Sequence, residues 1–245
     1  MEKTVKPYEA GGSKKEQVGK MFDTIAPHYD LLNRVLSLGV DIYWRKKAIS
    51  LLKKENPQVI LDVATGTGDV ALEMAKQLSP QKIVGVDIAR EMLEIGNKKV
   101  KAKNLDKIIE LKYGDSENLP FDDNTFDAVT VAFGVRNFEN LERGLSEMKR
   151  VLKPNGQLVV LEFSKPTLPP FKQLYDFYFK NILPFIGRIT SNDSKAYSYL
   201  YESVQAFPDG KNFEAILIKT GYSQPHSQKL TIGICSIYQA KKSPS

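Results

Sequence analysis

The sequence has few of the residues that build disulfides or metal centres. It contains one cysteine, Cys235, and two histidines among 245 residues. A single cysteine can form no internal disulfide, and its neighbours Ile234 and Ile237 predict a buried strand thiol rather than a nucleophile. Because His28 and His226 lie far apart in the sequence, we predict no metal site.

Long apolar runs and concentrated charge are also missing. No stretch approaches the ~20 apolar residues of a transmembrane helix. The polar start MEKTVKPYEAGGSKKEQ lacks the apolar segment of a signal peptide. The formal net charge of +6 is spread along the chain, which argues against a nucleic-acid partner. These absences predict a cytoplasmic protein.

The sequence does have enough hydrophobic residues, 42%, to bury a sizeable core. Its pattern is helical over residues 18–54, and strands then alternate with helices. The predicted strands are 58–64, 82–88, 107–115, 126–133, 156–163 and 228–242. Such alternation predicts an α/β fold with parallel βαβ units in an open, doubly wound sheet. We expect a single domain over 1–245, with a polar tail at 1–15 and a helical insertion at 166–205.

The stretch LDVATGTGD follows the first predicted strand and precedes a helix. Its glycines, Gly66 and Gly68, match the loose dinucleotide fingerprint G-x-G-x-x-A. Two carboxylates, Asp62 and Asp69, stand beside these glycines. Such carboxylates would repel a pyrophosphate, but they suit the ammonium and sulfonium groups of S-adenosylmethionine.

Further carboxylates close the next predicted strands. Asp87 lies about 20 residues after Gly68, where it can accept hydrogen bonds from both ribose hydroxyls. Asp115 ends the third strand and, with the Ser116 backbone, can meet an adenine amino group. Asp69 and Asp87 could instead be helix N-caps. Since ligands bind beyond the carboxyl ends of such strands, the whole set favours S-adenosylmethionine over NAD.

Longer stretches, including VGVDIAREMLEIG and EMKRVLKPNGQLVVLEFSKP, resemble the class I S-adenosylmethionine-dependent methyltransferases. APHYDLLN, FGVRN and YLYESVQAFP more narrowly resemble the menaquinone/ubiquinone biosynthesis C-methyltransferases. The resemblance implies a Rossmann-like, seven-stranded, mostly parallel sheet with an N-terminal helical lid over 18–54. It also implies methylation of a ring carbon in a prenylated hydroquinone, with demethylmenaquinol as the first expectation. A benzoquinol precursor of ubiquinone is the alternative.

The resemblance assigns cofactor contacts to Thr67 in the glycine turn and to four residues at strand ends: Asp87, Ile88, Asp115 and Ser116. Ala132 stands where some relatives have a serine contact, so that contact is not transferred.

Methyl transfer to a ring carbon needs an activated nucleophile. A phenol has a pKa near 10, so a cation or base close to the ring oxygen would help it to ionise. Candidates are Arg136 and Asn137 after the fourth strand, and Tyr29 and His28 in the lid. Ordinary alternatives are a surface ion pair of Arg136 with Glu139, a packed aromatic ring for Tyr29, and a turn for His28.

The aromatic stretch FKQLYDFYFKNILPFIGRI, residues 171–189, predicts either a channel wall for the isoprenoid tail or a helix packed on the sheet. Its cations Lys172, Lys180 and Arg188 could meet lipid headgroups, so we expect transient contact with the inner face of the cell membrane.

A homodimer is compatible with the sequence. Other functions that fit are methylation of another lipid or phenolic substrate, an NAD-dependent oxidoreductase, and a non-catalytic S-adenosylmethionine- or RNA-binding module.

Overall fold

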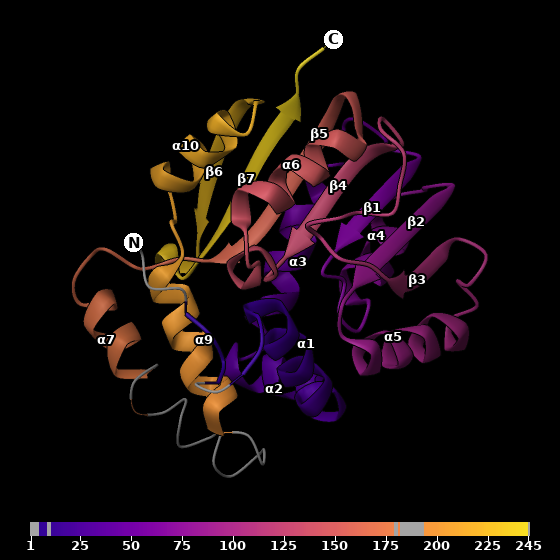
Figure 1. The fold of residues 1–245 in the computed structure, drawn as a ribbon. Helices are drawn as coiled ribbons and strands as arrows, with labels where there is room; N and C mark the ends of the chain where they lie inside the picture. The colour runs from indigo at the N-terminus through magenta and orange to yellow at the C-terminus, as the bar shows by residue number, and fades with distance from the viewer. Residues whose placement is uncertain (1–4, 9–10, 179–180, 182–193, 245) are drawn as a thin grey trace.

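The computed structural model describes residues 5–8, 11–178, 181 and 194–244 (Figure 1). A seven-stranded sheet in the order β3-β2-β1-β4-β5-β7-β6 forms its centre. The strands are β1 Val59–Val63, β2 Lys82–Asp87, β3 Ile109–Tyr113, β4 Phe126–Ala132, β5 Leu152–Phe163, β6 Tyr222–Leu230 and β7 Cys235–Lys242. The first five are parallel, and β7 runs antiparallel between β5 and β6. The predicted fold class is confirmed.

Helices cover both faces of this sheet (Figure 1). One face packs against α6 Leu141–Val151 and α10 Lys211–Lys219, and the other against α3 Val40–Ser50, α4 Asp69–Gln77 and α5 Arg90–Ala102. Successive residues of β1 alternate between the two cores: Ile60 faces one, and Leu61 the other. Each fully buried side chain of this kind contributes about 1.5–3 kcal/mol. A strand apolar on both sides is therefore fixed in the middle of the sheet.

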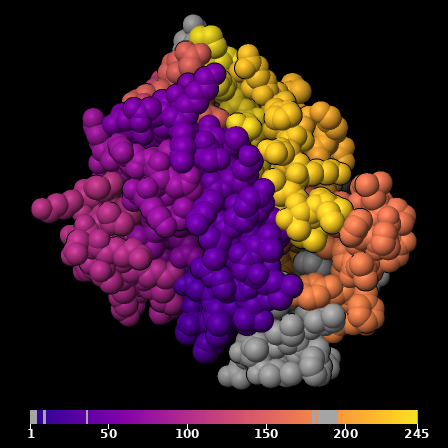
Figure 2. Space-filling model, turned by 180° about the vertical axis from the view of Figure 1, so that it is seen from behind, coloured from indigo at the N-terminus to yellow at the C-terminus, as the bar shows by residue number. Residues whose placement is uncertain are grey.

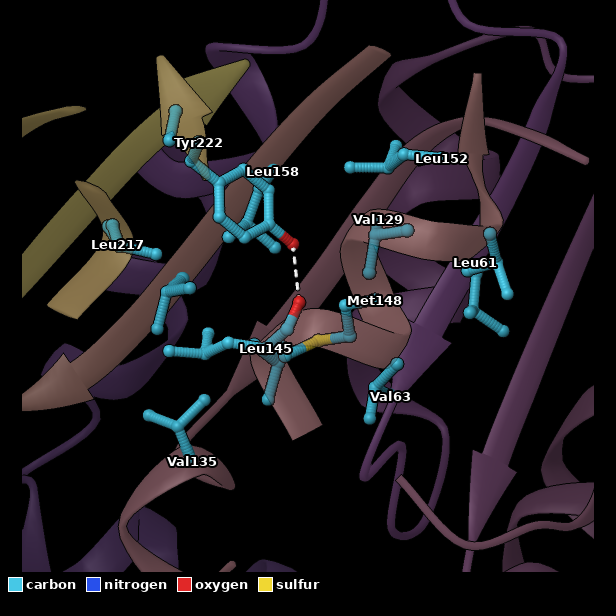
Figure 3. Packing of buried hydrophobic residues seen from close by; sticks show 14 of the residues in the cluster. Leu61, Val63, Val129, Val135, Leu145, Met148, Leu152, Leu158, Leu217 and Tyr222 are labelled. Atoms are coloured by element: carbon cyan, nitrogen blue, oxygen red, sulfur yellow. Dashed lines mark hydrogen bonds between the residues drawn. The ribbon is translucent and has the colours of Figure 1, made fainter. Parts of the chain in front are cut away.

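The core beneath α6 shows how tightly these layers fit. Met148 of α6 lies beside Val129 and Val63 of the sheet, and Leu145 belongs to the same buried cluster (Figure 3). On the same side, the buried Tyr222 hydroxyl donates a hydrogen bond of 3.0 Å to the Leu145 carbonyl. This bond ties the last part of the sheet to α6.

Short helices gather at the carboxyl ends of the parallel strands (Figure 1). They are α1 Lys14–Ile25, η1 Ala26–His28, α2 Tyr29–Leu36, η2 Val135–Asn137, α7 Phe171–Phe177 and α9 Ser194–Ala206. Ser13 and Glu16 form a capping box that starts α1. Gly39, in the left-handed region at φ 77°, turns the chain into α3. The predicted lid is thus helical, with breaks beside Pro27 and Gly39.

The C-terminal part differs from the sequence prediction. The single strand expected over 228–242 is wrong, because η4 Thr231–Gly233 separates β6 from β7. Thr231, Ile232 and Gly233 have φ values of 46°, 58° and 91°, which reverse the chain. β6, YSQPHSQKL, carries no apolar alternation because it is a largely exposed edge strand, so its pattern gave no strand signal. Cys235 is fully buried in β7, as predicted.

The predicted insertion at 166–205 is helical where the structure describes it, in α7 and α9. Lys172 is exposed on α7. Lys180 and Arg188, the other cations expected to meet lipid, lie outside the described residues.

Candidate active site

A narrow cleft lies between α1 and the carboxyl ends of β1, β2 and β3. Of the residues predicted to bind the cofactor, five line it: Gly66, Asp87, Ile88, Asp115 and Ser116. Asn137 lies on the opposite wall, and its Oδ1 atom is buried with no hydrogen-bond partner among the described residues. The parallel sheet thus brings together residues that are far apart in the sequence.

Asp87 holds the glycine turn in place from the end of β2. Its Oδ2 accepts from the Gly66 N–H at 2.7 Å, and its Oδ1 accepts from the Ala89 N–H at 2.9 Å. Burial raises the pKa of Asp87, although these backbone donors oppose the shift. Gly66 has φ 55°, and a Cβ added there would meet no atom within 4 Å. The turn therefore presents bare backbone to the cleft.

Asp62 lies behind the glycine turn rather than on the cleft wall. Its side chain accepts hydrogen bonds from the hydroxyls of Thr65 at 2.6 Å and Thr130 at 2.7 Å. Asp62 is only 1% exposed, and this burial raises the pKa of its carboxyl to about 6. In this position Asp62 stabilises the turn through Thr65.

Asp69 and Thr67 belong to a charge network that joins the lid to the glycine turn. Asp69 lies 2.8 Å from Lys99 of α5, 3.4 Å from Arg45 and 3.7 Å from Arg34. The Thr67 hydroxyl donates to Asp30 of α2 at 2.7 Å. Gly68 is the N-cap of α4, so Asp69 is not the cap that the alternative interpretation required. These groups hold α2, α3, α4 and α5 together.

Two lysines of α1 reach the far side of the cleft. Lys15 pairs with Asp115 at 2.7 Å and with Glu117 at 3.4 Å. Lys14 is buried, and its ammonium donates to the carbonyls of Arg136 and Phe138 at 3.0 and 2.9 Å. Burial, with some repulsion from Arg136, lowers the pKa of Lys14 to about 8.

A second, much larger cavity adjoins the cleft, with a volume of about 680 Å³. Phe22, Tyr29 and Phe133 line both, so these rings form the wall between them. The rest of the cavity is lined mainly by apolar side chains of α1, α2, α3, α7 and α9. Figure 2 shows the N-terminal helices, in indigo and violet, beside the orange segment that contains α7, with the surface hollowed between them.

Arg136 lines this cavity, as does Arg45. Nη1 of Arg136 lies 2.7 Å from Oε1 of Glu162, a fully buried residue of β5, and also donates to the Phe133 carbonyl. The guanidinium centre is 5.3 Å from the centroid of the Phe163 ring. Its Nε is buried with no hydrogen-bond partner among the described residues. The alternative of a surface pair with Glu139 is wrong, because Arg136 is buried and pairs with Glu162.

The other predicted catalytic residues occupy different positions. Tyr29 stands between the cleft and the cavity, where burial raises the pKa of its hydroxyl and a hydrogen bond with Asn33 opposes that shift. Asn137 lines the cleft and donates to the Phe133 carbonyl at 3.4 Å. His28 is exposed and lines neither space. Within the described part of the chain, no cluster of His, Cys, Asp or Glu could hold a metal ion.

Comparison with known proteins explains this arrangement. Residues 10–242 match the model of the ubiE/COQ5 methyltransferase family. The chain belongs to that family. It is 49% identical to a demethylmenaquinone methyltransferase of Bacteroides fragilis, over 97% of each chain. It is 47% identical to a ubiquinone/menaquinone biosynthesis C-methyltransferase of Geotalea daltonii, over 94% of this chain and 97% of that one.

Solved structures agree on the fold. An S-adenosylmethionine-dependent methyltransferase of Thermotoga maritima, described as a possible histamine N-methyltransferase, has a TM-score of 0.65 at 17% identity. The match covers 91% of this chain and 99% of that one. Family membership confirms an S-adenosylmethionine-dependent methyltransferase, so the oxidoreductase alternative is wrong.

The cleft suits S-adenosylmethionine chemically, because the ammonium, ribose hydroxyls and adenine amine of that molecule are all donors. The cleft offers acceptors: the carboxylates of Asp87 and Asp115, and the unpartnered Asn137 Oδ1. Gly66 leaves room for close approach.

Two residues of this site were not found from the sequence. Glu162 is the partner of Arg136, and Lys15 is the partner of Asp115. A glutamate within the apolar run VVLEF was a usable signal, because a charge in a buried strand needs a partner. Lys15 gave no such signal, since it begins a polar helix.

Proposed function

We propose that this methyltransferase methylates a ring carbon of demethylmenaquinol to give menaquinol. The observation that carries the proposal is the apolar cavity of about 680 Å³ beside the cofactor cleft. Its size lies in the range of small-molecule sites, and its lining suits a prenylated ring. The name of the Bacteroides fragilis relative supports a naphthoquinol. The name of the Geotalea daltonii relative supports the benzoquinol alternative as well.

The chain would contribute alignment and charge. S-adenosylmethionine, when bound, supplies a methyl group already activated by the sulfonium. In the proposed arrangement, Tyr29 and Phe133 hold the ring where the cavity meets the cleft. Alignment of two bound reactants can be worth ~7–11 kcal/mol. The guanidinium of Arg136 would stabilise the ring oxygen as its proton passes to water, which raises the electron density of the adjacent carbon. That carbon would then lose its own proton to water once it carries the methyl group.

The substrate is tested by quinone profiling in a strain without the gene. Loss of methylated naphthoquinone, restored by this gene, is the expected result. The purified enzyme should also methylate a short-tailed demethylmenaquinol faster than the matching benzoquinol. Equal or higher activity on a phenol without a prenyl tail would instead favour another phenolic substrate.

The role of Arg136 can be tested separately. Arg136→Ala should lower kcat by ~10²–10³, the range found when one oxyanion donor is removed, because its charge matters mainly in the transition state. Arg136→Lys should recover only part of this loss. Arg150→Ala is the control, since Arg150 forms ion pairs with Glu147 and Asp123 and lines neither the cleft nor the cavity. A wild-type single-turnover rate in Arg136→Ala would remove this residue from the mechanism.

We also propose that the enzyme takes its substrate from a lipid surface. In the described part of the chain, no helix has the length and apolar character needed to cross a membrane. Exposed apolar side chains lie instead along the cavity, including Leu38, Leu174, Phe177 and Ile232. Their position supports shallow, reversible contact of the enzyme with a lipid surface.

We also propose that the enzyme forms a homodimer, which light scattering would test.

A further inference from the structure

Tyr199 of α9 carries a buried hydroxyl in the wall of the large cavity. Only 3% of the residue is exposed, and its hydroxyl oxygen has no hydrogen-bond partner among the described residues. Buried polar groups are almost always paired, because an unpaired one loses its bonds to water without replacement. An unpaired hydroxyl buried on a residue of a cavity wall therefore points to a ligand that would pair with it.

Arg136 lies close to this hydroxyl. Its Nε–H is also buried and unpartnered within the described part of the chain, and Arg136 lines the same cavity. Burial raises the pKa of Tyr199, while the charge of Arg136 acts in the opposite direction. Helix α9 also contacts η2, which carries Arg136. The apolar cavity thus contains two neighbouring polar groups in need of partners.

Glu162 and the Phe133 carbonyl engage only the Nη1 atom of the Arg136 guanidinium. Oε1 of Glu162 binds Nη1 of Arg136 at 2.7 Å, and its Oε2 accepts from the Arg136 backbone N–H at 3.3 Å. The Phe133 carbonyl accepts from the same Nη1. These contacts fix the guanidinium at its Nη1 edge and leave Nε–H without a partner among the described residues.

We propose that the Tyr199 hydroxyl oxygen accepts from a ring hydroxyl of the substrate while the Arg136 Nε–H donates to a ring oxygen, and that Tyr199 thereby selects a hydroxylated headgroup. The inference rests on the proposed function, since it takes the substrate to be a quinol. An isoprenoid tail can lie against an apolar wall in many positions, so the tail alone does not orient the substrate. A few polar groups in the wall can fix the orientation of its ring. A site built to bond a hydroxyl strongly disfavours a ring that lacks it.

The test compares Tyr199→Phe with the wild-type enzyme on short-tailed demethylmenaquinol. Loss of one hydrogen bond to substrate should raise KM by roughly 10-fold, with little change in kcat or in S-adenosylhomocysteine affinity. The melting temperature of the free enzyme should not fall, because the lost hydroxyl has no protein partner in the described structure. A wild-type KM would overturn the inference.

Tyr222→Phe is the matched control. Its hydroxyl is also buried, but it donates to the Leu145 carbonyl (Figure 3). Tyr222 is not among the residues that line the cavity. Removal of this hydroxyl should lower the melting temperature by about 2–4 °C and leave KM unchanged. A similar loss of melting temperature in Tyr199→Phe would show a structural role and overturn the inference.

Two methyl ethers of the substrate, each blocking one ring hydroxyl, complete the test. The KM penalty of Tyr199→Phe should disappear with the ether that blocks the hydroxyl bound to Tyr199, because the ether has no proton to donate to the Tyr199 oxygen. An undiminished penalty with both ethers would contradict contact with the ring. Wild-type turnover of the quinol tests the proposed function separately: no turnover counts against that function, whereas turnover without a Tyr199→Phe penalty counts against this inference alone.

Discussion

Asp87 holds the glycine turn and also lines the narrow cleft beside α1. Its carboxylate accepts from the Gly66 and Ala89 N–H groups. Hydrogen bonds to a charged group are worth ~1.5–3 kcal/mol. We therefore expect Asp87→Ala to weaken S-adenosylmethionine binding by roughly 10- to 100-fold, as measured by calorimetry.

Asp127→Ala is the control for that experiment. Asp127 also accepts from two backbone N–H groups, those of Gln58 and Val59 at 2.9 and 2.8 Å, but it lines neither the cleft nor the cavity. Both variants should lose thermal stability, and only Asp87→Ala should lose affinity. Equal affinities would limit Asp87 to holding the turn.

Asp62 should make stability depend on pH. Because burial raises its pKa to about 6, the folded state holds a proton between about pH 4 and 6 that the unfolded state has released. Stability from this group is present at low pH and is lost as pH rises through that window. Asp62→Asn has no carboxyl to titrate, so it should not lose this stability as pH rises. From pH 4 to pH 7, its unfolding free energy minus that of the wild type should therefore increase by roughly 2–3 kcal/mol.

Thr130→Val should have the opposite effect on this pH dependence. It removes a hydroxyl that donates to Asp62, so the pKa of Asp62 should rise further and the loss of stability should extend to higher pH. Urea unfolding of both variants at several pH values measures these slopes. Parallel curves for Asp62→Asn and wild type would contradict the shifted pKa.

Helix α2 is attached to the glycine turn by charged and polar contacts. Asp30 lies 2.5 Å from the Lys99 ammonium and accepts from the Thr67 hydroxyl, while Leu31 and Val35 on the same helix are exposed. Asp30→Asn should loosen α2, and its amide hydrogens should exchange up to ~10-fold faster, corresponding to about 1 kcal/mol for a partly exposed pair.

Mass spectrometry of exchanged peptides checks this prediction. Lys82→Met is the control, because the pair of Lys82 with Glu110 is more exposed and joins β2 to β3. Exchange in α2 should not change in that variant. If α2 also stays protected in Asp30→Asn, the network does not hold the lid.

Over the whole molecule, exposed apolar side chains gather on the side where the cavity lies. Leu38, Leu174 and Phe177 are 89%, 61% and 59% exposed, and all three line the cavity. Replacing them by serine should abolish flotation with anionic vesicles, because the buried apolar area drives such contact. Salt should weaken wild-type binding only in part, since charge supplies only part of the attraction.

Ile218→Ser is the control for the membrane experiment. Ile218 is 60% exposed, but it belongs to α10, which lies at the opposite end of the molecule from α2 (Figure 1). This variant should float like wild type. Vesicle binding that survives in the triple variant would place the contact elsewhere.

Local patterns in the sequence were sufficient for the order of the elements from β1 to β5 and for bringing several predicted residues to the narrow cleft. Alternating strands and helices imply a parallel sheet, and such a sheet brings its carboxyl ends to one edge. The sequence alone therefore places Asp87 and Asp115 together, although they end different strands. The burial of Cys235 followed from its apolar neighbours in the same way. Period-two alternation did not show where β6 ends and β7 begins, because the positive φ angles of η4 leave no periodic signal.

Only the tertiary packing decided which side chains pair with one another. Arg136 could pair with Glu139 nearby in sequence, but it pairs with Glu162 on a neighbouring strand, where burial makes an unpaired charge too costly. Asp69 meets cations from three different helices. Tyr199 reaches the cavity wall only because α9 packs beside η2. The spacing of apolar residues indicates which side of a helix or strand is buried. Which other helix or strand covers that side depends on how elements distant in the sequence pack together.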